Sequence, residues 1–199
     1  SDEQGPGQQT KKVKSEATNA KNLDRVGDVK IVIDGGTLTV DAEGDGLDAN
    51  GSIEINGGTI VVNGPTSGAN AALDYDDNGI LNGGTVLFVD NGQMTMGFSS
   101  DSNQAYLMAS IQGTAGSTVE VVDSSGKTVA SLKASKSFST VLISSQDIKE
   151  GEKYTIKVGS NTTTATASKQ AVNVGGGPGK GGPGGGQPGQ GGPGGRQGR

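Results

Sequence analysis

The chain lacks several residue types on which common functions depend. It contains no cysteine, no histidine and no tryptophan, and only 3% of its 199 residues are aromatic. Without cysteine, disulfides and zinc–thiolate sites are excluded, and without histidine the usual general base and the commonest metal ligand are missing. Hydrophobic residues make up 30% of the chain and glycine occupies 37 positions, so a large hydrophobic interior is also excluded.

The start of the chain and its hydrophobic runs indicate whether it contains a membrane-spanning or signal segment. No run of 18 apolar residues is present, so we expect no membrane-spanning segment. The chain starts at Ser1 without an apolar signal region, and we therefore expect a processed chain.

Acidic residues are concentrated in one part of the sequence. Residues 24–101 carry thirteen carboxylates against Arg25 and Lys30, which gives this part a charge of −11, although the whole chain has a net charge of −5. Nucleic-acid binding requires clustered cations that displace counterions, so we expect no nucleic-acid partner. The acidic segment instead favours a bound cation.

Two short phrases repeat in this acidic segment with matching spacing. The first reads IDGGTLTV, INGGTIVV and LNGGTVLF, with its first glycines at Gly35, Gly57 and Gly83, 22 and 26 residues apart. The second, Leu-Asp, occurs at Leu47-Asp48 and Leu73-Asp74, in each case ten residues before a repeated glycine. A repeat of 20 to 30 residues with short strands and glycine turns is typical of a solenoid. The sequence therefore predicts an all-β fold that begins with a short parallel β-helix of about three coils.

The alternation of apolar and polar residues predicts which side chains face the interior of the coils. Threonines 37, 59 and 85 should form an outward ladder, and Asp34, Asn56 and Asn82 a polar one in which stacked side chains hydrogen-bond from coil to coil. Because this ladder begins with a carboxylate, we expect Asp34 near an edge. Gly79 is the one clear departure from the apolar pattern. The predicted interior positions are Ile31, Ile33, Leu38, Val40, Ile53, Ile55, Ile60, Val62, Gly79, Leu81, Val86 and Phe88.

The rest of the chain has a different sequence pattern. From Ala105 the repeat stops, and alternating segments separated by turn sequences predict antiparallel strands. The expected strands are Ala105–Ile111, Thr118–Val122, Thr128–Leu132, Ser137–Ile143, Tyr154–Val158 and Thr162–Thr166. We thus predict a flexible leader (1–27), β-helix coils (28–104), a small antiparallel β module (105–170) and a Gly/Pro/Gln-rich tail (171–199), which we interpret as a solvated spacer.

Two stretches carry a resemblance to a known family. The run GDGLDANGSIEINGGTIVVNGPTSGANAALDYDDNGILNGGT, from Gly44 to Thr85, and the run from Val119 to Ile156 resemble bacterial extracellular carbohydrate-binding domains. The resemblance covers about two thirds of the chain. It implies a right-handed parallel β-helix related to pectate lyases, calcium binding, recognition of polygalacturonate-type acidic polysaccharide, and an extracellular or cell-surface location. Members of that family usually carry more coils before this region, so the chain resembles the C-terminal section of such a protein.

Five aspartates are candidate calcium ligands. Asp48 and Asp74 occupy equivalent places in consecutive coils, and two like charges so close favour a cation between them. Asp45, Asp76 and Asp77 lie within a few residues of that pair along the sequence. Calcium takes six to eight oxygen ligands and needs neither histidine nor cysteine. The alternative interpretation is a solvated acidic face that aids solubility.

Candidate ligand-binding residues are few, and we expect no catalysis. Tyr75 could stack on a sugar face, and Lys30 is one of only two basic residues in the coils. A lyase would need calcium together with a base that removes a proton, and neither Lys30 nor Arg25 lies in a distinctive phrase. We therefore predict a non-catalytic, calcium-binding, polysaccharide-binding domain. The alternatives are a self-assembling fibre or matrix subunit and, third, a polysaccharide lyase.

Overall fold

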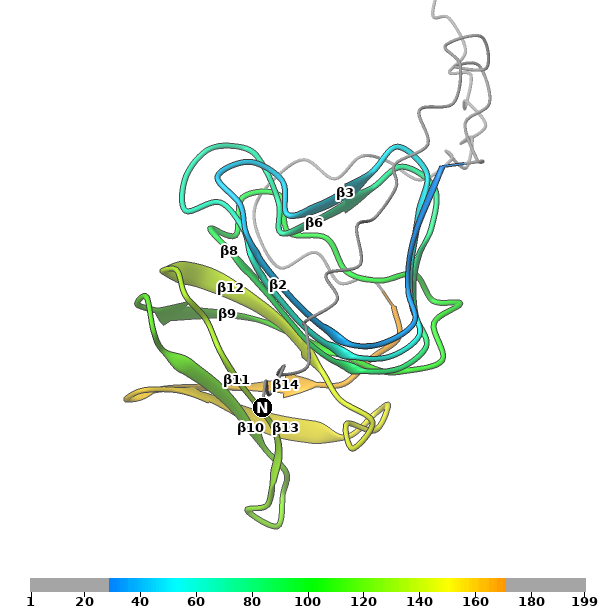
Figure 1. The fold of residues 1–199 in the computed structure, drawn as a ribbon. Helices are drawn as coiled ribbons and strands as arrows, with labels where there is room; N and C mark the ends of the chain where they lie inside the picture. Colours follow the sequence, from blue (N-terminus) through cyan, green and yellow to red (C-terminus); the bar gives the residue numbers. More distant parts are fainter. Residues whose placement is uncertain (1–28, 171–199) are drawn as a thin grey trace, which may run out of the picture.

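The protein consists of β-strands joined by turns and loops (Figure 1). The computed structural model describes residues 29–170, and within this range there are no helices. The predicted all-β class is confirmed. The predicted leader (1–27) and tail (171–199) lie outside the described residues. The strands are β1 (Lys30–Ile33), β2 (Thr37–Asp41), β3 (Leu47–Ala49), β4 (Ser52–Ile55), β5 (Thr59–Asn63), β6 (Leu73–Tyr75), β7 (Gly79–Leu81), β8 (Thr85–Asp90), β9 (Leu107–Gly113), β10 (Thr118–Val122), β11 (Thr128–Lys133), β12 (Phe138–Ser144), β13 (Lys153–Val158) and β14 (Asn161–Thr166).

Strands β1–β8, here called the coil stack, form three sets of parallel strands. The sets are β1-β4-β7, β2-β5-β8 and β3-β6. Each repeated phrase pairs with its equivalent in the next coil, so that Thr37 pairs with Thr59 and Thr59 with Thr85. Leu47 pairs with Leu73 in the same way. The register predicted from the 22- and 26-residue spacings is therefore confirmed.

The Gly-Gly pair of each phrase forms the turn between two strands of a coil. The second glycine of each pair has a positive φ, 86° at Gly36, 95° at Gly58 and 96° at Gly84. Residues with a Cβ rarely adopt this conformation, whereas glycine adopts it readily. The turns also stack closely, because a Cβ at Gly58 would lie 2.7 Å from the carbonyl oxygen of Gly36. Both requirements explain why the pair recurs in every coil.

The interior of the coil stack is filled by the apolar residues that alternation predicts. Ile53, Ile55, Ile60 and Val62, all from the middle of the stack, are completely buried. Their equivalents in the first coil, such as Ile31 and Leu38, are only partly buried because no described strand covers them. The last coil adds Leu81, Val86 and Phe88 to the same cluster.

A ladder of polar side chains runs along the turns of the coil stack. Asn56 Nδ2 donates to Asp34 Oδ1, and Asn82 Nδ2 donates to Asn56 Oδ1, both at 2.8 Å. These bonds confirm the predicted ladder and place Asp34 on β1's side of the stack, at an edge of its sheet. A fourth member, Asn103, donates to Asn82 Oδ1 at 2.7 Å. Sequence analysis missed it, although its spacing of 21 residues from Asn82 is close to the repeat.

The six later strands pair antiparallel, as predicted, but two of them, β9 and β12, belong to a sheet of the coil stack. Strands β12 and β9 add antiparallel to β8, which gives one sheet with the order β2-β5-β8-β12-β9. A second, antiparallel sheet has the order β11-β10-β13-β14. The two sheets enclose a second hydrophobic cluster that includes Leu107, Val121, Ile143 and Ile156. The coil stack therefore shares one sheet with β12 and β9, and the four-stranded sheet lies on the side away from β3 and β6 (Figure 1).

The end of the coil stack after β7 is covered by the segment that leads to β9. Ser99 N donates to Gly79 O at 2.6 Å, and Gln104 N donates to Leu81 O at 3.0 Å. The hydroxyls of Ser99 and Ser102 accept hydrogen bonds from the amides of Gly79 and Leu81. The edges of β7 and β8 are thus both occupied. No helix among residues 29–170 is long and apolar enough to cross a membrane.

Candidate functional site

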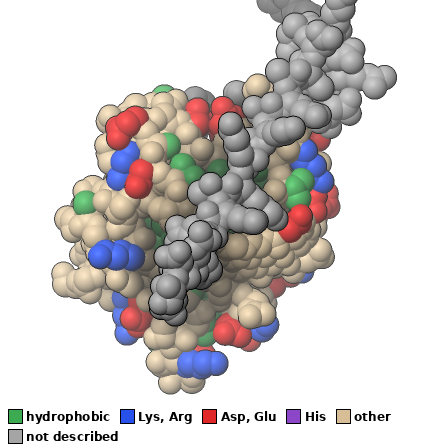
Figure 2. Space-filling view, viewed as in Figure 1, with side chains coloured by type: hydrophobic (Ala, Val, Ile, Leu, Met, Phe, Trp, Pro, Cys, Tyr) green, Lys and Arg blue, Asp and Glu red, His purple; other side chains and the backbone are tan. Residues whose placement is uncertain are grey.

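Asp48 and Asp74 lie side by side on the outer face of the two-stranded sheet β3-β6. Leu47 and Ala49 on either side of Asp48 are buried, so the Asp48 side chain points outward. Asp48 pairs directly with Asp74 in the parallel register. Neighbouring strands are about 4.8 Å apart, which places the two carboxylates within reach of one bridging cation. Figure 2 shows carboxylates around the upper rim of the molecule, the part where Figure 1 places β3 and β6.

The three other predicted ligands have different surroundings. Asp45 Oδ1 accepts a hydrogen bond from Ala71 N at 2.8 Å, and Asp77 Oδ2 accepts one from Ser52 Oγ at 3.0 Å. Asp76 is exposed next to Tyr75. Between residues 29 and 170, no group of three or more acidic side chains lies close enough together to hold a metal ion. The structure brings together Asp48 and Asp74, and calcium binding by these aspartates stays a prediction.

Tyr75 lies against the coil stack and explains why position 79 is a glycine. A Cβ at Gly79 would overlap the tyrosine ring, lying 2.7 Å from its Cζ. The Tyr75 hydroxyl donates to the carbonyl oxygen of Gly97 at 2.6 Å. Burial raises the pKa of this hydroxyl, although a hydrogen bond with Ser99 lowers it and the nearby Asp74 charge raises it. The ring is therefore partly covered, and only part of it is available to a ligand.

Lys30 lies on a different sheet from the aspartate pair. It is on β1, whereas Asp48 and Asp74 are on β3 and β6. Its ammonium group forms an ion pair with Glu54, and this interaction is the main cause of the lowered pKa of the Glu54 carboxyl. Sequence analysis missed Glu54 as its partner, although both residues lie on the polar face of paired strands. The structure therefore places Lys30 beside Glu54 and on a different sheet from Tyr75, Asp48 and Asp74.

Asp90 is a buried carboxylate that sequence analysis did not single out. It is only 3% exposed, at the end of β8. Its oxygens accept hydrogen bonds from Ala72 N at 3.2 Å, Gly92 N at 2.9 Å and Thr95 Oγ1 at 2.7 Å. Because these donors belong to two separate loops, Asp90 fixes one loop against the other. The sequence feature that could have identified Asp90 is an aspartate directly before Asn-Gly at the end of an apolar strand.

Comparisons of the chain with protein-family models, with curated proteins and with solved structures gave no match.

Proposed function

We propose that the protein is a secreted, surface-associated and non-catalytic domain that binds calcium and, through it, acidic polysaccharide of the polygalacturonate type. The coil stack is then a short right-handed parallel β-helix of about three coils. The observation that carries the proposal is the Asp48–Asp74 pair, which parallel pairing places on one outward face. The resemblance of the stretch from Gly44 to Thr85 to extracellular carbohydrate-binding domains supports the same function.

Calcium would be held between the two carboxylates on the β3-β6 face. The ion accepts six to eight oxygens in flexible geometry, so two aspartates leave positions for water and for the carboxylates of a uronate polymer. Few basic groups are available to neutralise an acidic polymer, which supports a bridging role for the ion. Within residues 29–101 Lys30 is the single basic residue, and Glu54 pairs with it. Lys136, from the segment between β11 and β12, is paired with Glu43. Recognition through a shared cation avoids the repulsion between an acidic surface and an acidic polymer.

The position of Lys30 supports binding without cleavage. Elimination from a uronate requires a group that removes the proton next to the carboxylate. Lys30 is held in an ion pair on another sheet, and it is not adjacent to the aspartate pair. The polysaccharide lyase therefore ranks below the binding domain among the candidate functions.

Thermal melting with calcium and with a chelator tests the proposal. Binding to the folded state alone adds about 2.7 kcal/mol to its stability when calcium is at a hundred times its dissociation constant. We expect calcium to raise the melting temperature of the parent and to be required for retention on immobilised polygalacturonate. The double variant Asp48→Asn/Asp74→Asn should lose both effects.

The matched control is Asp101→Asn/Asp147→Asn, which removes the same charge from two exposed positions outside the β3-β6 face. If the Asp48/Asp74 variant responded to calcium like the parent, the proposed calcium site would be wrong.

The lyase alternative is tested in the same samples by following the absorbance of unsaturated products released from polygalacturonate. Sustained product formation that disappears in Lys30→Ala would favour the lyase instead.

A further inference from the structure

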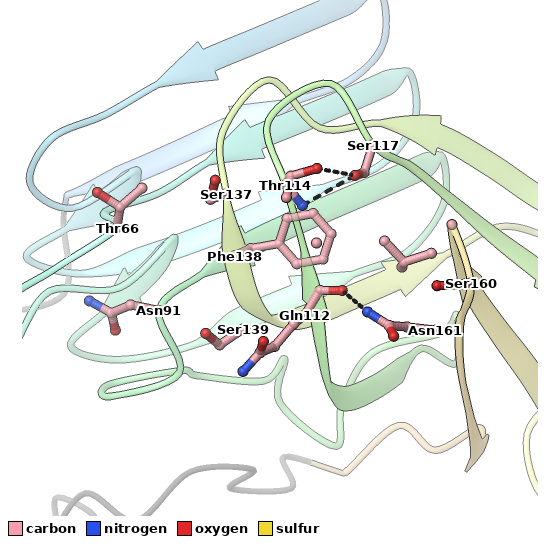
Figure 3. A pocket seen from close by; sticks show the side chains of 13 residues that line it. Thr66, Asn91, Gln112, Thr114, Ser117, Ser137, Phe138, Ser139, Ser160 and Asn161 are labelled. Atoms are coloured by element: carbon pink, nitrogen blue, oxygen red, sulfur yellow. Dashed lines mark hydrogen bonds between the residues drawn. The ribbon is translucent and has the colours of Figure 1, made fainter.

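A second candidate site lies where the coil stack meets the later strands, and none of its lining residues belongs to β3 or β6. Two adjoining hollows, of about 520 Å³ and about 810 Å³, are open to the surface. Both are lined by Asn91, Gln112, Ser139, Ser160 and Asn161, and we call this continuous depression the polar groove (Figure 3). Ligand pockets in proteins commonly have volumes of about 300 to 1,000 Å³.

The polar groove carries no charged side chain. Charged residues make up 19% of the chain, yet every polar residue that lines either hollow is serine, threonine, asparagine or glutamine. The apolar lining includes Phe138, which is 4% exposed and whose ring lies over Gly113. The groove therefore offers hydroxyl and amide groups on a small apolar floor.

Some of these side chains are fixed by the protein itself. Asn161 Nδ2 donates to the backbone carbonyl of Gln112 at 3.0 Å, which holds the β13–β14 turn against β9 (Figure 3). Asn91 donates to Gly68 O and accepts from Gln93 N. These bonds give the groove a defined wall on each side.

Other side chains in the groove are available to a ligand. Within residues 29–170, the side chains of Gln112, Ser139 and Ser160 make no hydrogen bond with the protein. Gln112 lies at an irregularity of the β9–β12 pairing, where Phe138 pairs with Gly113 and Thr140 with Ser110, so that two residues of β9 face Ser139 alone. Such bulges redirect side chains and are common beside binding sites.

We propose that the polar groove binds a neutral, polyhydroxylated glycan segment. Sugar hydroxyls donate and accept hydrogen bonds, as do the hydroxyls of Ser139 and Ser160 and the amide of Gln112. A ligand without charge needs no counter-ion, and the groove supplies none. This site is separate from the acidic face, so it binds without calcium and responds little to salt, because screening acts on charges.

The test is a nuclear magnetic resonance titration of the full chain with cellohexaose, xylohexaose and mannohexaose, in the presence of a calcium chelator. We expect at least one of these neutral hexasaccharides to shift the backbone amides of Gln112, Ser139 and Ser160 in a saturable way, equally at low and high sodium chloride. The double variant Gln112→Ala/Ser160→Ala should weaken binding about tenfold, which corresponds to the loss of one to two hydrogen bonds.

Gln146→Ala is the matched control, because Gln146 is an exposed glutamine in the loop after the opposite end of β12. It should bind like the parent, and all variants should melt like the parent. Three outcomes would overturn the proposal: no saturable shift with any of the hexasaccharides, shifts confined to β3 and β6, or binding that high salt or the chelator abolishes. A fourth is that removal of residues 171–199 shifts the same groove amides, which would identify the tail as the occupant. Calcium-dependent retention on polygalacturonate, measured separately, is independent of every one of these outcomes.

Discussion

Asp34 shows how a single residue can end a repeating ladder. Each asparagine in the ladder donates from Nδ2 to the preceding member, and the last acceptor is Asp34 Oδ1. An asparagine at position 34 would direct an amide donor toward a place where no described residue offers an acceptor. A carboxylate has no donor to satisfy, and a charge is easily solvated at an exposed position. Asp34 therefore completes the ladder at the first coil.

Gly79→Ala should destabilise the protein through the Tyr75 ring. The new methyl group would overlap the ring, and overpacking of this kind costs about 1 to 3 kcal/mol of unfolding free energy. In a Tyr75→Ala background the same change should cost much less, because the overlapping ring is gone. Chemical denaturation of the four chains measures the coupling. Gly35→Ala is the control, since its Cβ would have no neighbour within 4 Å. Equal losses in both backgrounds would contradict the packing argument.

The burial of Tyr106 predicts that the free energy of unfolding decreases at alkaline pH. The residue is 1% exposed, its hydroxyl donates to Phe98 O at 2.8 Å, and burial is the main cause of its strongly raised pKa. The unfolded chain then loses this proton near the ordinary pKa of 10.0, while the folded chain keeps it. The free energy of unfolding should therefore be fully maintained below about pH 10 and decrease as the pH rises above it.

Denaturation at a series of pH values measures this decrease, with Tyr106→Phe as the comparison. The variant loses a hydrogen bond worth about 1 kcal/mol at neutral pH, yet its stability should decline less between neutral and alkaline pH. Tyr75 and Tyr154 also have raised pKa values and leave a residual slope in both chains. An unchanged slope in the variant would show that Tyr106 is not the group responsible.

At the scale of strands, β8 and β12 join the two hydrophobic clusters. In β8, Val86 and Phe88 face the interior of the coil stack, whereas Leu87 and Val89 face the cluster between the two sheets. In β12, Leu142 belongs to the first cluster and Ile143 to the second. Side chains on successive positions of a strand point to opposite faces, so each strand is buried on both sides. The two clusters cannot separate without exposing both faces of this sheet.

We therefore expect Leu142→Ala and Ile143→Ala to destabilise the same unfolding transition. Both side chains are fully buried, and either truncation should cost about 2 to 5 kcal/mol. Because the strand is shared, each variant should show one cooperative transition when followed by calorimetry and by tyrosine fluorescence. Thr128→Ala, at an exposed position of β11, is the control. Two separated transitions in Leu142→Ala would mean that the coil stack and the later strands unfold independently.

Much of this element pattern could be predicted from the sequence, because the repeats encode it locally. The spacing of Leu47-Asp48 and Leu73-Asp74 set the register of β3 and β6, and alternation identified the buried positions. The predicted bounds of the later strands agree with the structure to within two residues at every end. The pairing of β12 with β8 could not be predicted, since every antiparallel strand offers the same local signal and the partner depends on tertiary packing.

The side-chain contacts of the predicted site residues also could not be predicted from the sequence. Spacing predicted that Asp48 and Asp74 lie together, because both occupy repeat positions. It could not predict that the Tyr75 ring turns inward over Gly79, or that Lys30 pairs diagonally with Glu54, since both depend on side-chain rotamers. The polar groove was missed for a related reason. Its residues come from β9, β12, the β13–β14 turn and the loop after β8, which are separated in the chain.

At the scale of the molecule, the two ends of the coil stack differ. The edges of β7 and β8 are occupied by the segment after residue 98 and by β12. At the other end, β1, β2 and β3 have no further partner strand among residues 29–170. Val29 and Val32 are 52% and 46% exposed there. Open edges of this kind can pair with another chain.

This asymmetry determines which assemblies the fold permits. A filament in which one chain's last coil continues into the next chain's first coil needs both ends open, and one end is occupied. Contact between two like ends closes on itself and stops at a dimer. We therefore expect light scattering and electron microscopy of the full chain to show no filaments with or without calcium, and at most a concentration-dependent dimer. Val32→Lys places a charge on the open edge and should abolish any dimer. The control Thr162→Lys, at an exposed position of β14, should leave it unchanged.

Filaments that persist in Val32→Lys would favour the fibre subunit over the binding domain. Loss of those filaments in a chain ending at Val174 would assign the assembly to the tail.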